Sequence, residues 1–292
     1  MNLNVEKKLT DKEASDIIGQ MPNESHYDTL INKKCVVKDN GEFVFAYIPN
    51  ALANDLIKKA YSSLKSGCTT TNNRSNATFK GSTAYPIKKD GTRSRSHRTL
   101  VQVKSGVGGF FDRYARIPYC RMCAFTEKNP DKWAKILPII HLINKYYKKY
   151  SPELYKNQKS KVEKTSQDFV IKNTAFTTTT FNMNYRTAFH RDRGNLTGGC
   201  AGMGVFGAGK YKGGYLCFPE YKIAVDIRPT DIIIMNNTTL IHGNTELIGE
   251  YGEYERISLV CYMREKMMRC GTIKEEIERA KKYGAKISEE II

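Results

Sequence analysis

The sequence predicts an α+β protein, with a double-stranded β-helix (jelly-roll) core and flanking helices. Short β-rich runs follow one another between residues 212 and 262, separated by turns that contain glycine, proline and aspartate. Such runs are typical of antiparallel strands in a sandwich or jelly roll. The Gly213-Gly214 turn, two histidines and an arginine also occur in the order that a double-stranded β-helix requires. Segments with helical periodicity lie outside this region, which predicts helices around the β core.

The elements of the N-terminal third are marked by local signals. Thr10-x-x-Glu13 is a capping box and predicts the start of a short helix. Residues 42–48 form a β-rich run that Pro49 stops. One face of the helix expected next carries Leu52, Leu56, Ile57, Ala60 and Leu64. Residues 66–98 are rich in serine, threonine, asparagine, glycine and arginine, and we expect a long loop there.

The remaining elements complete the predicted order. Residues 133–150 have helical periodicity, and we interpret His141 as a packed histidine within that apolar pattern. Strands are expected at residues 176–184, 212–218, 223–227, 232–235 and 257–262. Thr272-x-x-Glu275 caps a closing helix that Gly284 can end. We therefore expect one catalytic unit: an N-terminal elaboration with a basic loop (1–104), a core (105–268, the β-helix mainly 170–266) and a C-terminal helix (269–292).

Three residues near the predicted strands form a candidate metal site. His190 and Asp192 are two positions apart, so both side chains point the same way from an extended segment. His242 follows a later apolar run and completes a set of two imidazoles and one carboxylate. This ligand set on one face of Fe(II) leaves positions open for a bidentate co-substrate and O2. Arg256 lies fourteen residues past His242 and offers a planar fork for a carboxylate.

An isolated His-x-Asp can also arise by chance in a chain with five histidines. The order of the strands, the Gly-Gly turn and the arginine favours the metal site. Cys120-x-x-Cys123 is the only tight cysteine pair, and it lacks the second pair or the histidines that a zinc site needs. The eight cysteines are otherwise scattered, and we expect reduced thiols.

The formal net charge is +17, from 47 basic and 30 acidic residues. A surplus of this size is typical of proteins with a polyanionic partner, although an A/T-biased genome also enriches lysine. One basic cluster lies in the predicted loop and favours DNA: Lys88, Lys89, Arg93, Arg95, Arg98 and Lys104. A second cluster alternates with tyrosines, and a solvated helix face explains it as well as a nucleic-acid surface does: Lys145, Lys148, Lys149, Lys156, Lys159, Lys161 and Lys164.

No run of eighteen apolar residues occurs, and the first residues lack the apolar stretch of a signal peptide. We expect an intracellular protein that is not secreted, without a membrane or an obligate protein partner.

Several longer motifs lie between residues 105 and 268. They are Gly109-Phe110-Phe111-Asp112-Arg113, Tyr119-Cys120-Arg121, Asn173-Thr174-Ala175-Phe176-Thr177-Thr178, His190-Arg191-Asp192-x-x-Asn195, Gly213-Gly214-Tyr215-Leu216-x-Phe218-Pro219, His242-Gly243-Asn244-Thr245 and Arg256-x-Ser258. Together these motifs resemble the TET/JBP oxygenases, which oxidise the 5-methyl group of pyrimidines in DNA, and the shorter algal, fungal and viral members look closest.

Carried over by position, the resemblance implies roles for individual residues. His190, Asp192 and His242 would be the iron ligands, and Arg256 with Ser258 would hold the distal carboxylate of 2-oxoglutarate. Asn195 coincides with a position that faces the target base and is Asn or Asp in different members. Arg264 departs from the histidine that animal members place near the base, and Arg121 is a candidate for a carboxylate or phosphate contact.

The implied reaction needs Fe(II), 2-oxoglutarate and O2, with ascorbate as a stimulant. The expected product is the hydroxymethyl form of 5-methylcytosine, and repeated turnover would give formyl and carboxyl forms. The target nucleotide must be flipped out of the duplex to reach the metal. A DNA substrate implies the nucleus in a eukaryote, and the cytoplasm or nucleoid otherwise.

Four alternatives remain open: a thymine hydroxylase acting on DNA, a prolyl or lysyl peptidyl hydroxylase on the same scaffold, an inactive DNA-binding β-helix module, and a structural cupin-like protein.

Overall fold

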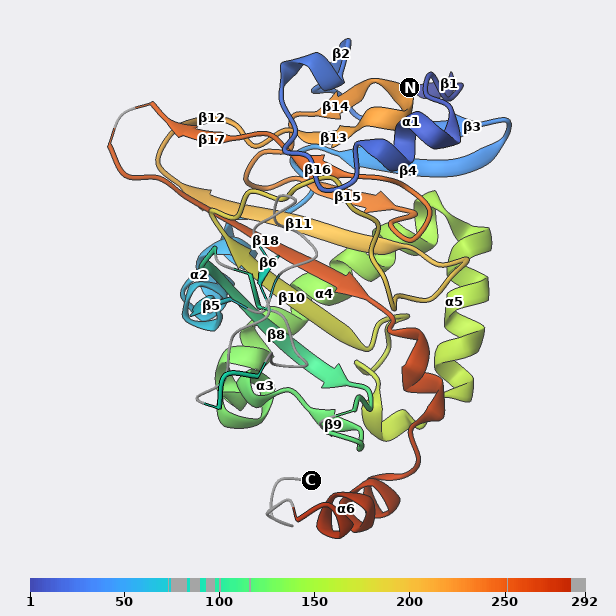
Figure 1. Cartoon of the computed structure of the whole chain (residues 1–292), viewed down its shortest axis with the longest axis vertical. Helices are drawn as coiled ribbons and strands as arrows, with labels where there is room; N and C mark the ends of the chain where they lie inside the picture. Colours follow the sequence, from blue (N-terminus) through green and yellow to red (C-terminus); the bar gives the residue numbers. More distant parts are fainter. Residues whose placement is uncertain are drawn as a thin grey trace.

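Two stacked β-sheets form the centre of the protein, and helices cover the outer face of the larger sheet (Figure 1). The computed structural model describes residues 1–72, 74, 83–84, 90–92, 98–99, 101–115, 117–250 and 252–284. This α+β architecture confirms the fold class predicted from the sequence.

The larger sheet is antiparallel apart from the pairing of its first two strands, which is parallel. In spatial order its strands are β1 (Asn2–Val5), β3 (Cys35–Asp39), β4 (Glu42–Ile48), β15 (Ile232–Met235), β11 (Ala201–Ala208), β18 (Glu255–Tyr262), β10 (Thr178–Met183), β8 (Val103–Phe111) and β5 (Thr69–Thr71), with β9 (Arg121–Met122) paired to the end of β8. The N-terminal strands β3 and β4 thus belong to the same sheet as the core strands. The predicted boundary between the N-terminal elaboration and the core, at residue 104, falls inside β8. This division of the chain stays a prediction.

The smaller sheet faces the strands β3, β4, β11 and β15 of the larger one. Its strands are β16 (Gly243–Asn244), β13 (Leu216–Phe218), β14 (Ile223–Val225) and β2 (Thr29–Ile31). Two further antiparallel pairs lie outside both sheets: β12 (Tyr211–Gly213) with β17 (Leu247–Gly249), which extends to the left in Figure 1, and β6 (Thr83–Ala84) with β7 (Arg98–Thr99).

The described helices include those expected after Thr10, near residues 52–64, at 133–150 and after Thr272. They are α1 (Asp11–Asp16), η1 (Glu24–His26), α2 (Asn54–Gly67), α3 (Ala124–Lys128), α4 (Pro130–Tyr150), α5 (Pro152–Lys164), η3 (Gln167–Phe169), η4 (Pro219–Tyr221), η5 (Glu265–Arg269) and α6 (Ile273–Lys282). Both predicted capping boxes are present, at Thr10 and at Thr272. Gly284, with φ +72°, follows α6 and suits the left-handed backbone at a helix end. None of the described helices combines the length and apolar character needed to span a bilayer.

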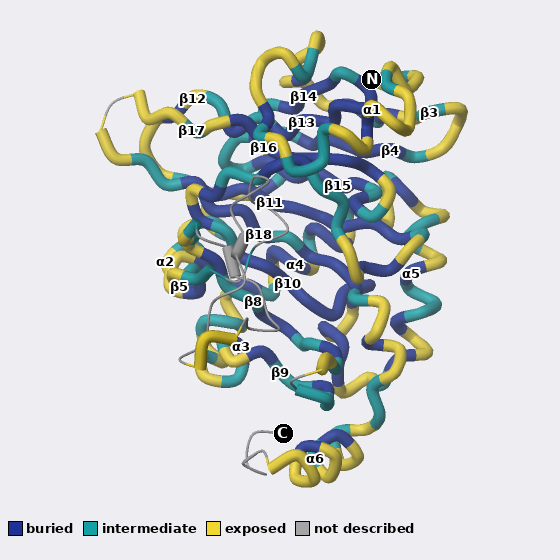
Figure 2. Tube along the Cα trace, in the orientation of Figure 1, coloured by how far each residue is buried: buried dark blue, intermediate teal, exposed yellow. Residues whose placement is uncertain are grey.

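The main core lies between α2, α4 and the larger sheet, and Figure 2 shows the central strands buried along their length. Ile136, Ile139, Ile140 and Ile143 of α4 are fully buried there, as the helical periodicity predicts. Burial of one such side chain contributes about 1.5–3 kcal/mol. A second core fills the space between the two sheets.

Glycines in β8 allow α2 to approach this edge of the sheet closely. A Cβ on Gly106 would lie 1.9 Å from the carbonyl oxygen of Gly67, which is the last residue of α2. No side chain fits at that distance, so glycine at position 106 is required by packing.

His141 is exposed, so the prediction that it is a packed histidine is wrong. One residue along a helix is a rotation of about 100°, and this turns His141 away from the face that Ile140 buries. Its Nε2 lies 3.1 Å from the carbonyl oxygen of Lys172.

The prediction of reduced thiols fails for two cysteines. Cys120 and Cys270 form a disulfide although 150 residues separate them, so spacing along the chain gives no sign of the pair. Cys123 is a free, buried thiol. Burial raises its pKa to about 12, which leaves the uncharged thiol at neutral pH. With Cys120 bonded elsewhere, the Cys-x-x-Cys motif does not form a metal site.

Of the two predicted basic clusters, the structure describes the second one and little of the first. The side chains of Lys88, Lys89, Arg93, Arg95 and Arg98 lie outside the described residues, whereas Lys104 lies on β8. In the second cluster the lysines line α4 and α5, and the tyrosines between them pack on the core. Tyr147 is fully buried. The tyrosines therefore contribute packing, which favours the solvated helix face for this cluster.

Candidate active site

The two histidines of the candidate metal site lie opposite each other in adjacent chain segments. His190 and His242 form an isolated antiparallel bridge, and the backbone N–H of each donates to the carbonyl oxygen of the other at 3.0 Å. Their rings are 4.5 Å apart between centroids. The short bridge thus brings together two residues that are far apart in the sequence.

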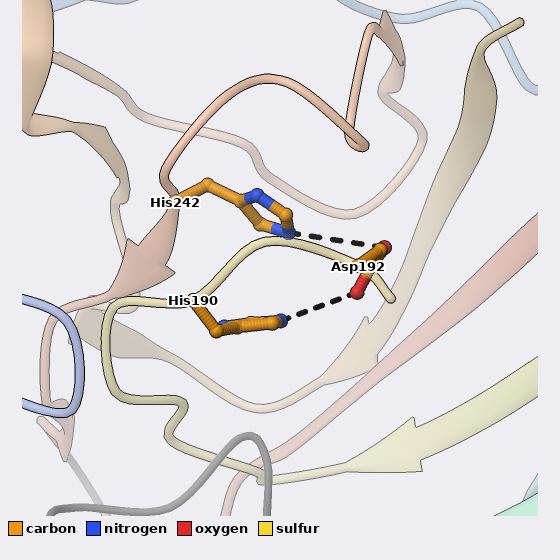
Figure 3. A group of neighbouring side chains, drawn as sticks. All are labelled: His190, Asp192 and His242. Carbon is orange, nitrogen blue, oxygen red and sulfur yellow. Dashed lines mark ion pairs between the residues drawn. The ribbon is translucent and has the colours of Figure 1, made fainter. Parts of the chain in front are cut away.

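The three predicted ligand residues converge, as Figure 3 shows. Nε2 of His190 lies 3.3 Å from Oδ1 of Asp192, and Nε2 of His242 lies 4.0 Å from Oδ2 of the same carboxylate. The ligand atoms all lie within 4.8 Å of one another, and no other such group of three or more occurs in the described part of the chain. Each Nδ1 lies near a backbone carbonyl oxygen, Ala188 at 2.8 Å and Leu240 at 3.1 Å. A hydrogen bond there leaves Nε2 free to bind a metal ion.

The electrostatics favour an ionised Asp192 and a neutral His242, which are the forms that bind a metal ion. Burial alone would raise the pKa of Asp192, but the hydrogen bond with His190, the charges of both histidines and the Asn237 amide outweigh it and hold the pKa at about 2. Burial and the neighbouring His190 lower the pKa of His242 to about 4. Burial alone would also lower the pKa of His190, but the hydrogen bond and the charge of Asp192 outweigh burial and raise this pKa.

Asn237 supports the carboxylate from the chain segment that precedes His242. Its Nδ2 donates to Oδ2 of Asp192 at 2.5 Å, and its carbonyl oxygen accepts from the Asp192 backbone N–H at 3.0 Å. Sequence reasoning missed this residue, because nothing in its spacing distinguishes it from other asparagines in turns.

The ligand residues line a cavity of about 280 Å³ between the sheets. Along β18, residues 257, 259 and 261 pack under the helices, so residues 256, 258, 260 and 262 face the cavity. Thr180 and Asn182 of β10 face it in the same way, and Thr180 Oγ1 lies 2.8 Å from the Tyr262 hydroxyl. The cavity also includes Arg74, which sequence reasoning missed because it lies in the predicted loop.

Arg256 is the buried cation of this cavity. It is 6% exposed, and its Nε has no hydrogen-bond partner among the described residues. Burial, as the largest influence, lowers its pKa, which shows that the surroundings do not fully compensate the charge. A buried guanidinium with an unpaired N–H is suited to bind a carboxylate. Ser258, also buried, lines the same cavity two residues along the strand.

The structure brings two of the three predicted substrate contacts to this cavity. Asn195 and Arg264 pair in an isolated antiparallel bridge, and both line the cavity. The Arg264 side chain is held by the buried Asp112, with Nε 2.7 Å from Oδ1 and Nη2 3.3 Å from Oδ2. It also stacks on Phe111, 4.2 Å from the ring centroid.

The third predicted contact, Arg121, lies elsewhere. Its guanidinium is 5.2 Å from the ring centroids of both Phe111 and Tyr114, and it lines a second cavity of about 720 Å³. The structure therefore does not bring Arg121 together with the metal ligands.

Residues 108–265 match the sequence model of the Tet_JBP family, described as the oxygenase domain of the 2OGFeDO superfamily. The chain belongs to the TET/JBP oxygenase family. The match covers more than half of the chain and includes all eight predicted site residues.

Three relatives illustrate the similarity to TET/JBP proteins. The bifunctional helicase and thymine dioxygenase JBP2 of Trypanosoma brucei brucei is 33% identical over 178 residues, which are 60% of this chain and 16% of the relative. Its namesake in Trypanosoma cruzi is 28% identical over 87% of this chain and 22% of the relative. Thymine dioxygenase JBP1 of Trypanosoma brucei brucei is 31% identical over 62% and 22%, respectively. The chain thus spans about a fifth of the length of these relatives.

The fold also matches a solved TET structure. NgTET1 in complex with 5mC DNA superimposes with a TM-score of 0.57 at 17% identity, covering 94% of this chain and 100% of that chain. This likeness confirms the double-stranded β-helix fold.

Proposed function

We propose that the protein is an Fe(II)- and 2-oxoglutarate-dependent dioxygenase that oxidises the 5-methyl group of a pyrimidine in DNA. One observation carries the proposal: the cluster of His190, Asp192 and His242 shares a cavity with the buried guanidinium of Arg256, whose Nε has no hydrogen-bond partner among the described residues, in a chain of this oxygenase family.

The residues of the cavity fit both Fe(II) and 2-oxoglutarate, the two groups that the proposed reaction needs. Two Nε2 atoms and a carboxylate are the donor set of a facial Fe(II) site. The orphaned N–H of Arg256 would donate to the distal carboxylate of 2-oxoglutarate, with Ser258 beside it. With O2, these groups supply the oxidation of a C–H bond, while 2-oxoglutarate loses CO2 to become succinate.

The side chains around the ligands are suited to hold a single flipped base. Asn195 offers both a donor and an acceptor to a Watson–Crick edge, and Arg264 offers donors. Because Asp112 holds the Arg264 guanidinium in place, its contacts with a base would be fixed before binding. Water would be excluded by the base itself as it fills the cavity.

For the base, the relatives favour thymine, since the three curated relatives are named thymine dioxygenases. 5-Methylcytosine, the first expectation from the sequence, carries the same methyl group at the same ring position and remains the second candidate. DNA as partner is supported by the net charge of +17. A DNA substrate implies a location in the nucleus of a eukaryote, or in the nucleoid otherwise.

Measurement of succinate release distinguishes DNA from peptides as the substrate. We expect the protein, supplied with Fe(II), 2-oxoglutarate, O2 and ascorbate, to release succinate faster with DNA than with prolyl or lysyl peptides. A His190→Ala, Asp192→Ala variant is the control for the metal site. Stimulation by peptide alone would favour a peptidyl hydroxylase, and no release with any substrate would favour an inactive binding module.

A further inference from the structure

A buried carboxylate outside the ligand set lies between the two chain segments that carry the ligands. Glu220, in η4, is 1% exposed. Its Oε2 accepts from the backbone N–H of Ile241 at 2.8 Å. Its Oε1 lies 3.4 Å from Nη2 of Arg191 and 3.1 Å from Nζ of Lys7. A buried carboxylate needs such partners, and here they come from three separate segments.

Two of these partners are immediate neighbours of metal ligands. Arg191 lies between His190 and Asp192 in the sequence, and Ile241 directly precedes His242. One carboxylate therefore contacts both ligand-bearing segments, one through each oxygen. Arg191 adds a second connection, because its Nε donates to the carbonyl oxygen of Thr239 at 2.8 Å.

Besides the contacts of Glu220, the two ligand segments are held by one β-bridge and by hydrogen bonds of Asp192 with Asn237 and of Thr187 with Asn244, rather than by a strand ladder. His190 and His242 pair only as an isolated bridge, outside the named strands. A single bridge forms two hydrogen bonds, whereas a ladder such as β10–β18 aligns six residue pairs. Metal binding requires the two Nε2 atoms to keep their separation, so contacts that hold the two segments together affect the metal directly.

We propose that Glu220 is a positioning residue of the metal centre, which holds the segments of His190–Asp192 and His242 at the spacing that metal binding requires. This inference rests on the metal site proposed above. Residues that orient metal ligands typically change metal affinity about 10–100-fold when they are replaced.

The same contacts connect the N-terminal segment to the metal centre. Besides the Lys7 ion pair, the backbone N–H of Lys8 donates to the carbonyl oxygen of Glu220 at 2.7 Å. This segment precedes the region of the family match, residues 108–265. The support of the metal centre thus includes residues outside the matched oxygenase domain.

Titration of the metal-free, full-length protein with Mn(II), with free Mn(II) measured by electron paramagnetic resonance, tests the proposal. Glu220→Gln keeps an acceptor for Ile241 but loses the charge that faces Arg191, and Glu220→Ala loses both. We expect the Mn(II) Kd to rise about tenfold for the first variant and about 100-fold for the second. Arg191→Met removes the partner of Glu220 Oε1 on the His190–Asp192 segment, together with the Nε contact with Thr239, and should raise the Kd about tenfold.

Glu276 provides a matched control. It is also a buried glutamate, 2% exposed, held by Arg113 and by the backbone N–H groups of Cys120 and Gly271. None of these partners is next to a metal ligand in the sequence, so Glu276→Gln should lower the unfolding temperature without changing the Mn(II) Kd. A purely structural role of Glu220 would give this same pattern.

The outcomes separate the positioning role from the metal site itself. An unchanged Kd in folded Glu220→Gln overturns the role of Glu220. Should both Glu220 variants fail to fold, an unchanged Kd in Arg191→Met overturns it instead. If the wild-type protein binds no Mn(II), or binds it as tightly after His190→Ala and Asp192→Ala, the metal site itself is refuted.

Discussion

Replacement of Arg256 should weaken 2-oxoglutarate binding without destabilising the protein. Its Nε has no partner among the described residues, so the folded protein gains no hydrogen bond from this atom. Each hydrogen bond between charged groups contributes about 1.5–3 kcal/mol. Loss of a fork of two such bonds corresponds to about 3 kcal/mol, or roughly a 100-fold rise in KM for 2-oxoglutarate in Arg256→Met. Arg256→Lys keeps the charge but not the fork, and should raise KM about tenfold.

The assay is succinate production at saturating DNA as 2-oxoglutarate is varied, with thermal unfolding of the ligand-free protein beside it. We expect KM to rise while kcat at saturation changes little, because the carboxylate is held equally before and during the reaction. The unfolding temperature should stay the same or rise, because replacing a buried, incompletely paired charge by an apolar group is often neutral or stabilising. An unchanged KM, or a large loss of stability in Arg256→Met, would refute the reasoning.

Four further predictions follow from the same structure. Asn237→Ala removes the amide hydrogen bond to Asp192 and should raise the Mn(II) Kd about tenfold, and an unaltered Kd would count against that support. Gly106→Ala places a Cβ against the Gly67 carbonyl and should cost about 3 kcal/mol in urea unfolding, and full stability would show that the contact can relax. Burial would raise the pKa of Glu276, but its ion pair and backbone hydrogen bonds outweigh burial and lower it, so its contribution is present above the unfolded pKa and is lost as the pH falls through the lower folded value. Glu276→Gln should therefore destabilise the protein more at neutral pH than in acid, and equal losses at both would contradict the shift. Finally, the logarithm of the DNA-binding constant should fall linearly with the logarithm of the salt concentration. A flat response would contradict contacts with phosphates.

Two of the three metal ligands could be predicted from their local spacing, whereas His242 was predicted from its place after a later apolar run. His190 and Asp192 are two residues apart on extended backbone, and β18 places Arg256 and Ser258 on one face by the same alternation. The capping boxes at Thr10 and Thr272 depend on only four residues each, and both are present. The fold class followed from these short-range patterns taken together.

Residues that act through long-range contacts could not be predicted. Glu220 follows a proline in a short turn, where a glutamate is usually exposed, and only the fold places it against Arg191 and Ile241. The disulfide partners Cys120 and Cys270 are 150 residues apart.

Hydrophobic periodicity also does not predict the burial of every single side chain in an element. His141 lies within an apolar helical pattern, yet it faces solvent because it is one residue away from the buried Ile140. The sequence predicts a strand at residues 176–184 but not its burial: five of the six residues of β10 are buried, since helices cover one face and the other is turned toward the cavity. A pattern thus identifies an element more securely than the environment of one side chain.

Nucleoside mass spectrometry tests the proposed reaction most directly. The full-length protein would be incubated with Fe(II), 2-oxoglutarate, ascorbate and DNA that contains both thymine and 5-methylcytosine, with the His190→Ala, Asp192→Ala variant as control. We predict a new hydroxymethyl base that is absent with the variant, and its identity names thymine or 5-methylcytosine as the target. Unchanged DNA from protein that binds iron would contradict the proposed oxidation of DNA.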